Sequence, residues 1–168
     1  MVESFYCTYN LPVVTVRPFN TYGPRQSARA VIPTIITQAL TQSTLRLGNL
    51  DTTRDFTFVD DTVAGFIAAA EAAGVEGGVF NLGVGEDIRV GDLANMIVHK
   101  VGRPVEIVVT PERLRPERSE VLRLISDNRL ARERLGWSPQ VGLDQGLDRT
   151  IDWISKNLDR YQPDVYQF

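Results

Sequence analysis

The fold of this 168-residue chain is decided by the stretch Leu11-Pro12-Val13-Val14-Thr15-Val16-Arg17-Pro18 and the Asn20-Thr21-Tyr22-Gly23-Pro24-Arg25 segment after it. The first run is β-branched and apolar on both faces, which is typical of a buried parallel strand that ends at Pro18. The second run is rich in Gly and Pro and predicts a turn. Apolar residues then recur at helical spacing over residues 30–40, where Pro33 is tolerated in the first turn. Strand, turn and helix in this order indicate an α/β fold.

The same alternation continues along the rest of the chain. Short β-branched or aromatic runs predict strands at residues 55–59, 79–82, 105–109 and 121–125. Helical patterns are found at residues 1–9, 60–70, 91–101, 126–136 and 143–158, with Gly102 and Gly136 as stops of two of them. No shift of composition marks a linker, so we expect a single unit over residues 1–168.

Several of these helices carry more specific predictions. Asp60 and Asp61 are expected to cap one helix and to place negative charge at its N-terminus. The buried stripe of that helix is expected to consist of Val63, Phe66, Ile67 and Ala70. Ser126 is expected to cap the helix that Gly136 ends. Residues 1–9 have the pattern of the second half of an amphipathic helix, with Val2, Phe5 and Tyr6 on one side.

The composition is that of an ordinary globular domain, with 43% apolar and 23% charged residues. The net charge is −3, from 18 basic and 21 acidic side chains, which argues against a dedicated nucleic-acid binder. No apolar run reaches the roughly 18 residues that a membrane span needs. The first residues have no basic region and no apolar stretch of signal type, so a cytoplasmic location is the expectation.

Cys7 and His99 are the only residues of their types, and they limit the possible chemistry. One cysteine excludes an internal disulfide and a cysteine-built zinc site, and we expect Cys7 to be a small buried or half-buried residue. A serine–histidine triad or a histidine metal cluster would have to use His99, which is better interpreted as a surface residue near a helix C-terminus. We therefore predict no metal site and expect neither Cys7 nor His99 to be catalytic.

The Gly-rich candidate for phosphate binding is Gly83-Val84-Gly85-Glu86-Asp87-Ile88. It follows a predicted strand, but Ile88 replaces the third glycine of a dinucleotide fingerprint. Two acids stand where a pyrophosphate would need positive potential. A loop between a strand and a helix is the favoured interpretation.

Arginines are more informative than the glycines. Arg113, Arg115, Arg118 and Arg123 are crowded into one loop and strand, and Arg54 directly precedes another predicted strand. Guanidinium groups bind phosphate in a bidentate way, so Arg54 and Arg115 are compatible with a diphosphate clamp; a solvated surface with local ion pairs is the alternative. Arg89 stands where a helix cap is expected, so either the helix boundary differs or this arginine reaches an anionic ligand.

Three segments together resemble a known family. They are Arg17-Pro18-Phe19-Asn20-Thr21-Tyr22-Gly23-Pro24-Arg25, Arg54-Asp55-Phe56-Thr57-Phe58-Val59-Asp60-Asp61 and Phe80-Asn81-Leu82-Gly83. Their order and spacing are similar to those of the NAD-dependent epimerase/dehydratase family, extended short-chain dehydrogenase/reductases that act on nucleotide sugars. Residues 115–121 and the Leu135-Gly136-Trp137-Ser138-Pro139 segment fit the same pattern. Among its subfamilies, the nucleotide-sugar 4,6-dehydratases look most similar.

The resemblance implies a fold and a set of site residues. The fold would be the carboxy-terminal part of an extended Rossmann-type protein with its substrate-binding subdomain. Its substrate residues would be Asn20 against the nucleotide sugar, Val31 and Ile32 against the nucleotide, Arg54 and Arg115 at the phosphates, and Glu120 at the ribose or base. Arg89 is added as a possible anion contact. Pro18 and Phe19 would lie near the nicotinamide of NAD.

The chain also departs from the family pattern. It contains no glycine fingerprint, no acidic ribose partner and no Tyr-x-x-x-K pair, because Asn10 and Val13 stand four residues after Tyr6 and Tyr9. We therefore expect the substrate-binding half without the amino-terminal NAD-binding half, with no tight NAD binding by this chain alone. A UDP-sugar is the expected ligand and a homo-oligomer the expected assembly. The alternatives are a stand-alone nucleotide-sugar binding module and a truncation product that oligomerises without function.

Overall fold

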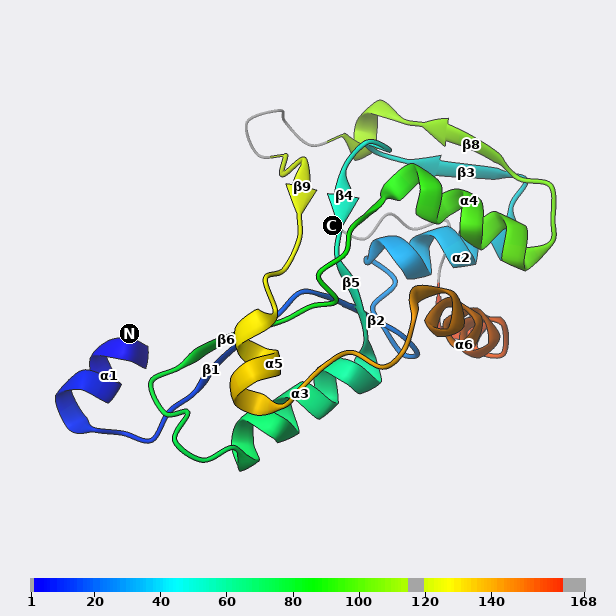
Figure 1. The fold of residues 1–168 in the computed structure, drawn as a ribbon. Helices are drawn as coiled ribbons and strands as arrows, with labels where there is room; N and C mark the ends of the chain where they lie inside the picture. The colour runs from blue at the N-terminus through cyan, green and yellow to red at the C-terminus, as the bar shows by residue number, and fades with distance from the viewer. Residues whose placement is uncertain (1, 115–119, 162–168) are drawn as a thin grey trace.

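The computed structural model describes residues 2–114 and 120–161, and strands and helices alternate along them (Figure 1). The helices are α1 (Val2–Tyr9), α2 (Val31–Thr41), α3 (Val59–Glu71), α4 (Val90–Val101), α5 (Arg129–Leu135) and α6 (Leu143–Ser155), with the 3-10 turns η1 (Pro111–Arg113) and η3 (Leu158–Arg160). The strands are β1 (Thr15–Pro18), β2 (Asn20–Tyr22), β3 (Thr44–Leu47), β4 (Thr53–Arg54), β5 (Phe56–Phe58), β6 (Val79–Leu82), β7 (Ile88–Arg89), β8 (Glu106–Val109) and β9 (Arg123–Leu124).

The strands pair mostly in parallel, as an α/β fold requires. β1 pairs with β6, β2 with β5, and β3 with β8, each in parallel. β4 lies between antiparallel β7 and parallel β9. The β1–β6 and β3–β8 pairs lie at opposite ends of the molecule (Figure 1). The predicted α/β class is confirmed.

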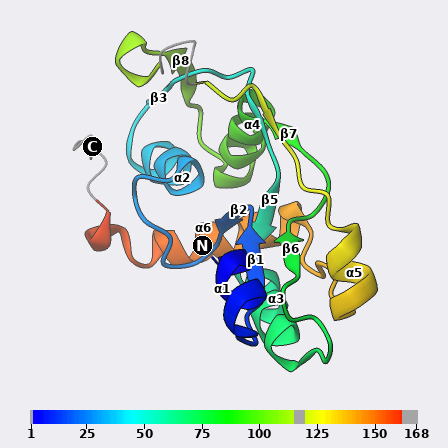
Figure 2. The same cartoon turned by 90° about the vertical axis from the view of Figure 1, so that its left-hand side faces the viewer.

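Two hydrophobic clusters form the core. The larger one joins α2, α4 and α6 to β2, β5 and β3 through fully buried side chains that include Ile32, Ile35, Ile36, Leu45, Leu93, Ile97, Leu147 and Ile154. The smaller one covers β6 with α5 and the segment after it, through Val75, Phe80, Leu82, Ala131 and Trp137. α2 and α4 lie side by side in both views (Figures 1 and 2).

The helix ends confirm the predicted stops and correct the predicted caps. Gly102 and Gly136 adopt the left-handed conformation, with φ of 72° and 62°, just after α4 and α5. The capping role of Asp60 and Asp61 is wrong, because α3 begins at Val59 and both acids lie inside its first turn. Ser126 is not a cap either, because it lies two residues before the N-cap of α5 and is buried.

The predicted buried stripe of α3 is also wrong. Val63, Phe66 and Ile67 are 51%, 49% and 52% exposed, and Ala70 is exposed as well. Gly65 and Ala69 face the interior instead. The reason is close packing, because a Cβ atom at Gly65 would collide with the Leu82 side chain of β6. Small residues therefore face the strand, and the larger ones on α3 point away from it.

The same end of the molecule carries more exposed apolar side chains. Val2, Phe5, Tyr9, Leu11 and Val79 join Val63, Phe66 and Ile67 in this group, which we call the apolar end face. These residues come from α1, the segment between α1 and β1, α3 and β6, all at the end of the molecule that carries the β1–β6 pair (Figure 1). β1 is thus parallel, as predicted, but its described residues are half-buried or exposed rather than buried. Cys7 is exposed, which contradicts the prediction of a buried thiol.

Candidate functional site

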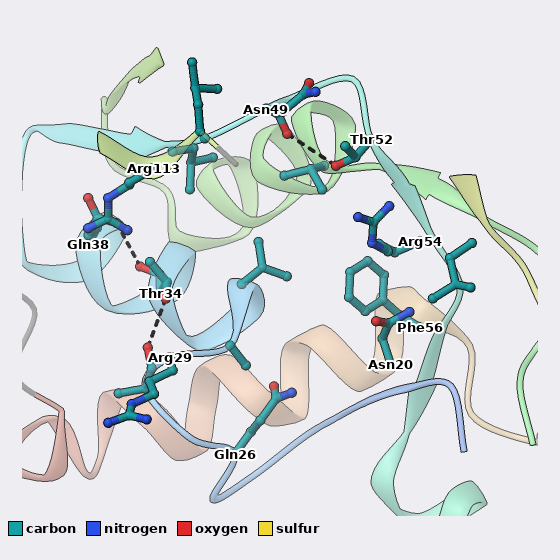
Figure 3. Close-up of a pocket in the computed structure, with 18 of the residues that line it drawn as sticks. Asn20, Gln26, Arg29, Thr34, Gln38, Asn49, Thr52, Arg54, Phe56 and Arg113 are labelled. Atoms are coloured by element: carbon teal, nitrogen blue, oxygen red, sulfur yellow. Dashed lines mark hydrogen bonds between the residues drawn. The ribbon is translucent and has the colours of Figure 1, made fainter. Parts of the chain in front are cut away.

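A cavity of about 640 Å³ lies between β2, α2, β4 and η1. Figure 3 shows the side chains around it. Asn20, Arg54 and Phe56 lie together at one end, and Thr34, Gln38 and Arg113 lie at the other. The volume is in the range of small-molecule sites, which is about 300–1,000 Å³.

Arg54 is a firmly held cation of the cavity lining. β4 places it in the middle strand of a three-stranded sheet. Its Nη1 donates to the carbonyl of Thr53 at 2.8 Å, and its Nη2 lies 3.3 Å from Oε1 of Glu120. The Arg54 and Glu120 side chains are only 15% and 11% exposed, so this ion pair is partly shielded from water.

Asn20 reaches the cavity from β2. Its Nδ2 donates to the carbonyl of Asp55 at 2.8 Å, which fixes the amide plane and leaves Oδ1 as an acceptor. β2 and β5 pair with Asn20 opposite Phe56, so the amide and the ring stand next to each other (Figure 3). This end of the cavity therefore combines an amide acceptor, an aromatic ring and a guanidinium.

The other end of the cavity was not predicted from the sequence. Gln38 is buried on α2, and its Oε1 accepts from the backbone N–H of Arg46 at 2.9 Å, which ties α2 to β3. A Cβ atom at Gly48 would collide with the carbonyl oxygen of Arg113, so η1 can approach only because this residue is glycine. The available signals were a glutamine three residues after the apolar Ile35 and a glycine directly after a strand.

Four of the predicted substrate residues line this one cavity, namely Asn20, Val31, Arg54 and Glu120. They come from β2, the start of α2, β4 and the segment before β9, and they are separated by up to a hundred positions in the sequence. The fold thus brings together side chains that only the family resemblance connected.

The remaining predicted site residues lie elsewhere. Ile32 is fully buried in the larger cluster and does not line the cavity. Pro18 and Phe19 lie at the carboxyl end of β1, outside the lining, where the Phe19 N–H donates to Leu82 at 2.9 Å. Arg89 is the N-cap of α4, outside the lining, with its exposed side chain paired to Asp51. Arg115 lies outside the described residues.

Asp55, next to Arg54, has a structural function. Its buried carboxylate accepts the backbone N–H groups of Val84 at 2.8 Å, Gly85 at 3.0 Å and Ser126 at 3.0 Å. Two N–H donors of the Gly-rich loop, those of Val84 and Gly85, are therefore already used within the chain. They are not free to bind the pyrophosphate of a dinucleotide, which supports the interpretation of the loop as a connection between a strand and a helix.

Asp87 joins the three strands that carry Arg54. Its carboxylate accepts from Thr53 Oγ1 at 2.5 Å and from Arg123 Nε at 2.8 Å. The Arg123 guanidinium, followed by the Thr53 hydroxyl, lowers the pKa of the Asp87 carboxyl below its ordinary value. β7, β4 and β9 are thus linked by side chains as well as by their backbones.

Comparison with known proteins identifies the family. The family model described as GDP-mannose 4,6 dehydratase matches residues 1–150. The chain belongs to this family of nucleotide-sugar epimerases and dehydratases. It is 38% identical over 150 residues to a UDP-glucose 4-epimerase of Mycolicibacterium smegmatis, with 87% of this chain and 46% of the relative covered. The resemblance to NAD-dependent epimerases and dehydratases is confirmed.

Solved structures agree with this assignment. UDP-glucose 4-epimerase of Thermotoga maritima, solved with UDP-glucose, is 31% identical with a TM-score of 0.83 over 93% of this chain and 50% of that protein. A dTDP-glucose 4,6-dehydratase of Bacillus anthracis, solved with NAD, is 26% identical with a TM-score of 0.83 over 96% and 50%. The Rossmann-type fold is confirmed, and the chain spans about half the length of these relatives. Because both epimerases and dehydratases match, the choice of a 4,6-dehydratase stays a prediction.

The described ranges hold neither a cluster of metal ligands nor a membrane-spanning helix. Residues 2–114 and 120–161 contain no group of three His, Cys, Asp or Glu side chains that could hold a metal ion. None of the helices in the same ranges is long and apolar enough to cross a bilayer. The cavity at Arg54 is therefore the site on which a function can be argued.

Proposed function

We propose that this chain forms the nucleotide-sugar-binding part of an NAD-dependent nucleotide-sugar 4,6-dehydratase or epimerase. Asn20 contacts the nucleotide sugar, Val31 packs against the nucleotide, and Glu120 accepts from the ribose or base. Arg54 and Arg115 hold the diphosphate. A UDP-sugar is the preferred ligand, since the relatives named above include an epimerase solved with UDP-glucose.

One observation carries this proposal: four residues matched to family motifs line a single cavity, and one of them is a shielded arginine. A guanidinium with five donors in one plane suits a phosphate group better than a lysine would. Membership of the family provides the second support, because its members act on nucleotide sugars.

Calorimetric titration of the purified chain with UDP-glucose, UDP-N-acetylglucosamine, dTDP-glucose and GDP-mannose tests the proposal. We expect saturable binding with one site per chain and the tightest binding for a UDP-sugar. If none of the four ligands binds, the proposal is wrong. Binding led by another base would correct the nucleotide and leave the sugar-nucleotide assignment intact.

The binding of NAD by this chain is a separate prediction. The 168 residues hold no glycine fingerprint and no Tyr-x-x-x-K pair, and the N–H groups of Val84 and Gly85 donate to the Asp55 carboxylate. We therefore expect no tight NAD binding and no turnover by this chain alone. Micromolar NAD affinity in a titration, or a 4-keto product after incubation with NAD and a nucleotide sugar, would contradict this.

A further inference from the structure

Arg54 is already engaged by an acid of its own chain. Its Nη2 lies 3.3 Å from the Glu120 carboxylate, and both side chains line the cavity. The guanidinium also donates to the neutral carbonyl of Thr53 through Nη1. A phosphate that binds Arg54 must therefore approach a cation whose charge is balanced by Glu120.

The backbone keeps Glu120 in this position. The segment after it is bonded to β4, because Thr53 N donates to Leu122 O at 2.8 Å and Asp55 N donates to Leu124 O at 3.0 Å. The ion pair between Arg123 and Asp87 holds the same segment through a side chain as well. A carboxylate held so close acts at high effective concentration toward Arg54.

We propose that Glu120 is an internal competitor that occupies Arg54 until the phosphate group of a ligand displaces it. The proposal rests on the proposed function, since it assumes a phosphate ligand at Arg54. A carboxylate and a phosphate both bind the planar face of a guanidinium, so they compete for the same donors. Binding therefore includes the cost of breaking a partly shielded ion pair.

A purely structural role for Glu120 gives the opposite expectation. If the ion pair only positions Arg54, its removal misplaces the guanidinium and weakens the binding of an anion. If Glu120 competes, its removal frees Arg54 and strengthens that binding. The direction of the change in affinity separates the two roles.

Inorganic pyrophosphate is the probe, because it carries neither ribose nor base and so excludes other contacts of Glu120. We expect Glu120→Gln to bind pyrophosphate about 3- to 10-fold more tightly than the parent chain, the range of a partly exposed ion pair. Glu120→Asp is one methylene shorter and should give a smaller gain. Arg54→Ala should not show this gain in affinity, and neither should the double variant that combines Arg54→Ala with Glu120→Gln.

Glu112→Gln is the matched control, because Glu112 is an acid that lines the same cavity, whereas the acid paired with Arg54 is Glu120. We expect it to change the pyrophosphate affinity less than twofold. An equal gain in this control, weaker binding by Glu120→Gln, or no pyrophosphate binding by any variant would overturn the competitor role.

UDP-glucose titration separates the competitor role from the proposed function. If it binds while the pyrophosphate affinities do not change, only the competitor role fails. If pyrophosphate behaves as expected and no nucleotide sugar binds, only the proposed function fails.

Discussion

Arg54 and Asp55 are neighbours with opposite tasks. In an extended segment successive side chains point to opposite sides, so Arg54 reaches the cavity while Asp55 reaches the interior. Asp61 repeats the structural task further on, because its carboxylate accepts the N–H groups of Gln140 at 2.9 Å and Val141 at 3.0 Å. Family motifs in this chain therefore combine ligand-facing groups with acids that join distant segments.

The first prediction at this scale concerns the diphosphate clamp. We expect Arg54→Ala, and likewise Arg115→Ala, to weaken UDP-sugar binding about ten- to a hundredfold, since a charge-assisted hydrogen bond is worth about 1.5–3 kcal/mol. Arg54→Lys should restore only part of the affinity, because an ammonium cannot grip two oxygens in one plane. Calorimetric titration measures these affinities.

The control variant for this series must not change a residue that holds distant segments of the chain together. Arg132 lies on an exposed helix face but donates to Asn128, which in turn holds Gly83 and Val84. Arg129 is better suited, because it is exposed and pairs only locally with Asp127. If Arg54→Ala and Arg115→Ala bind like Arg129→Ala and the parent chain, the assignment of the clamp is incorrect.

The second prediction concerns Asp55. Asp55→Asn keeps the shape but turns an amide donor toward one of three N–H groups, so we expect the free energy of unfolding to fall by about 2–4 kcal/mol. Urea denaturation measures it. Asp51→Asn is the control, since the Asp51 side chain is 78% exposed, and it should leave the denaturation midpoint unchanged. Equal denaturation midpoints for the two variants would show that the Asp55 carboxylate does not stabilise the fold.

Some residues of the site could be predicted and others could not. Asn20 and Arg54 belong to motifs with fixed spacing, and Glu120 follows from the same resemblance. Gln38 and Gly48 could not be predicted, because Gln38 depends on how β3 folds back along α2, and Gly48 depends on the approach of Arg113, which is distant in sequence. Local patterns carry no information about such tertiary contacts.

Among the secondary-structure elements, α2 and α4 were predictable and the very short strands β4 and β7 were not. α2 and α4 were found within about a residue of their ends, because their apolar positions repeat over three turns. β4 and β7 have two residues each, too few for any period, and Asp87 next to β7 bonds to Thr53 of β4. The buried face of α3 was assigned to the wrong side because Gly65 packs more closely than any larger residue could.

The third prediction uses the pKa of Asp87. Because its pKa in the folded chain lies below 3.8, the value of an unperturbed aspartate, ionised Asp87 stabilises the fold above that pH. This stabilisation is lost as the pH falls through the lower folded-state pKa. We expect the difference in unfolding free energy between the parent and Asp87→Asn to be constant from pH 7 to 5 and to shrink below 3.8.

Arg123→Gln provides the matched variant, since Arg123 is the largest cause of the lowered pKa. It should reduce the same acid-dependent difference, as measured by urea denaturation across the pH series. A parent and two variants whose stabilities fall in parallel at low pH would show that Asp87 does not link the three strands electrostatically.

At the scale of the whole molecule, the two ends differ in how well they are covered. The larger core cluster is enclosed by α2, α4 and α6, whereas the β1–β6 pair has α3 and α5 near it and an apolar end face beyond them. Within the described residues β1 has β6 as its one strand partner, so its other edge presents unpaired N–H and C=O groups. Parallel sheets are normally buried on both sides, so this end is suited to further contacts.

The last prediction follows from the apolar end face. Phe66 and Ile67 on α3 are large apolar side chains that are about half exposed, and exposed apolar residues of this kind favour association. We expect the chain to form a dimer or a larger assembly, measured by light scattering across a concentration series. The double variant Phe66→Glu and Ile67→Glu should shift this equilibrium toward the monomer, because charges there would be buried on association.

Leu130→Glu is the matched control for this double variant. Leu130 is an exposed leucine on α5 outside the apolar end face, and its change should leave the assembly unchanged. A parent chain that stays monomeric at high concentration would rule out association through this surface, and an equal effect of the control would move the interface to another part of the molecule.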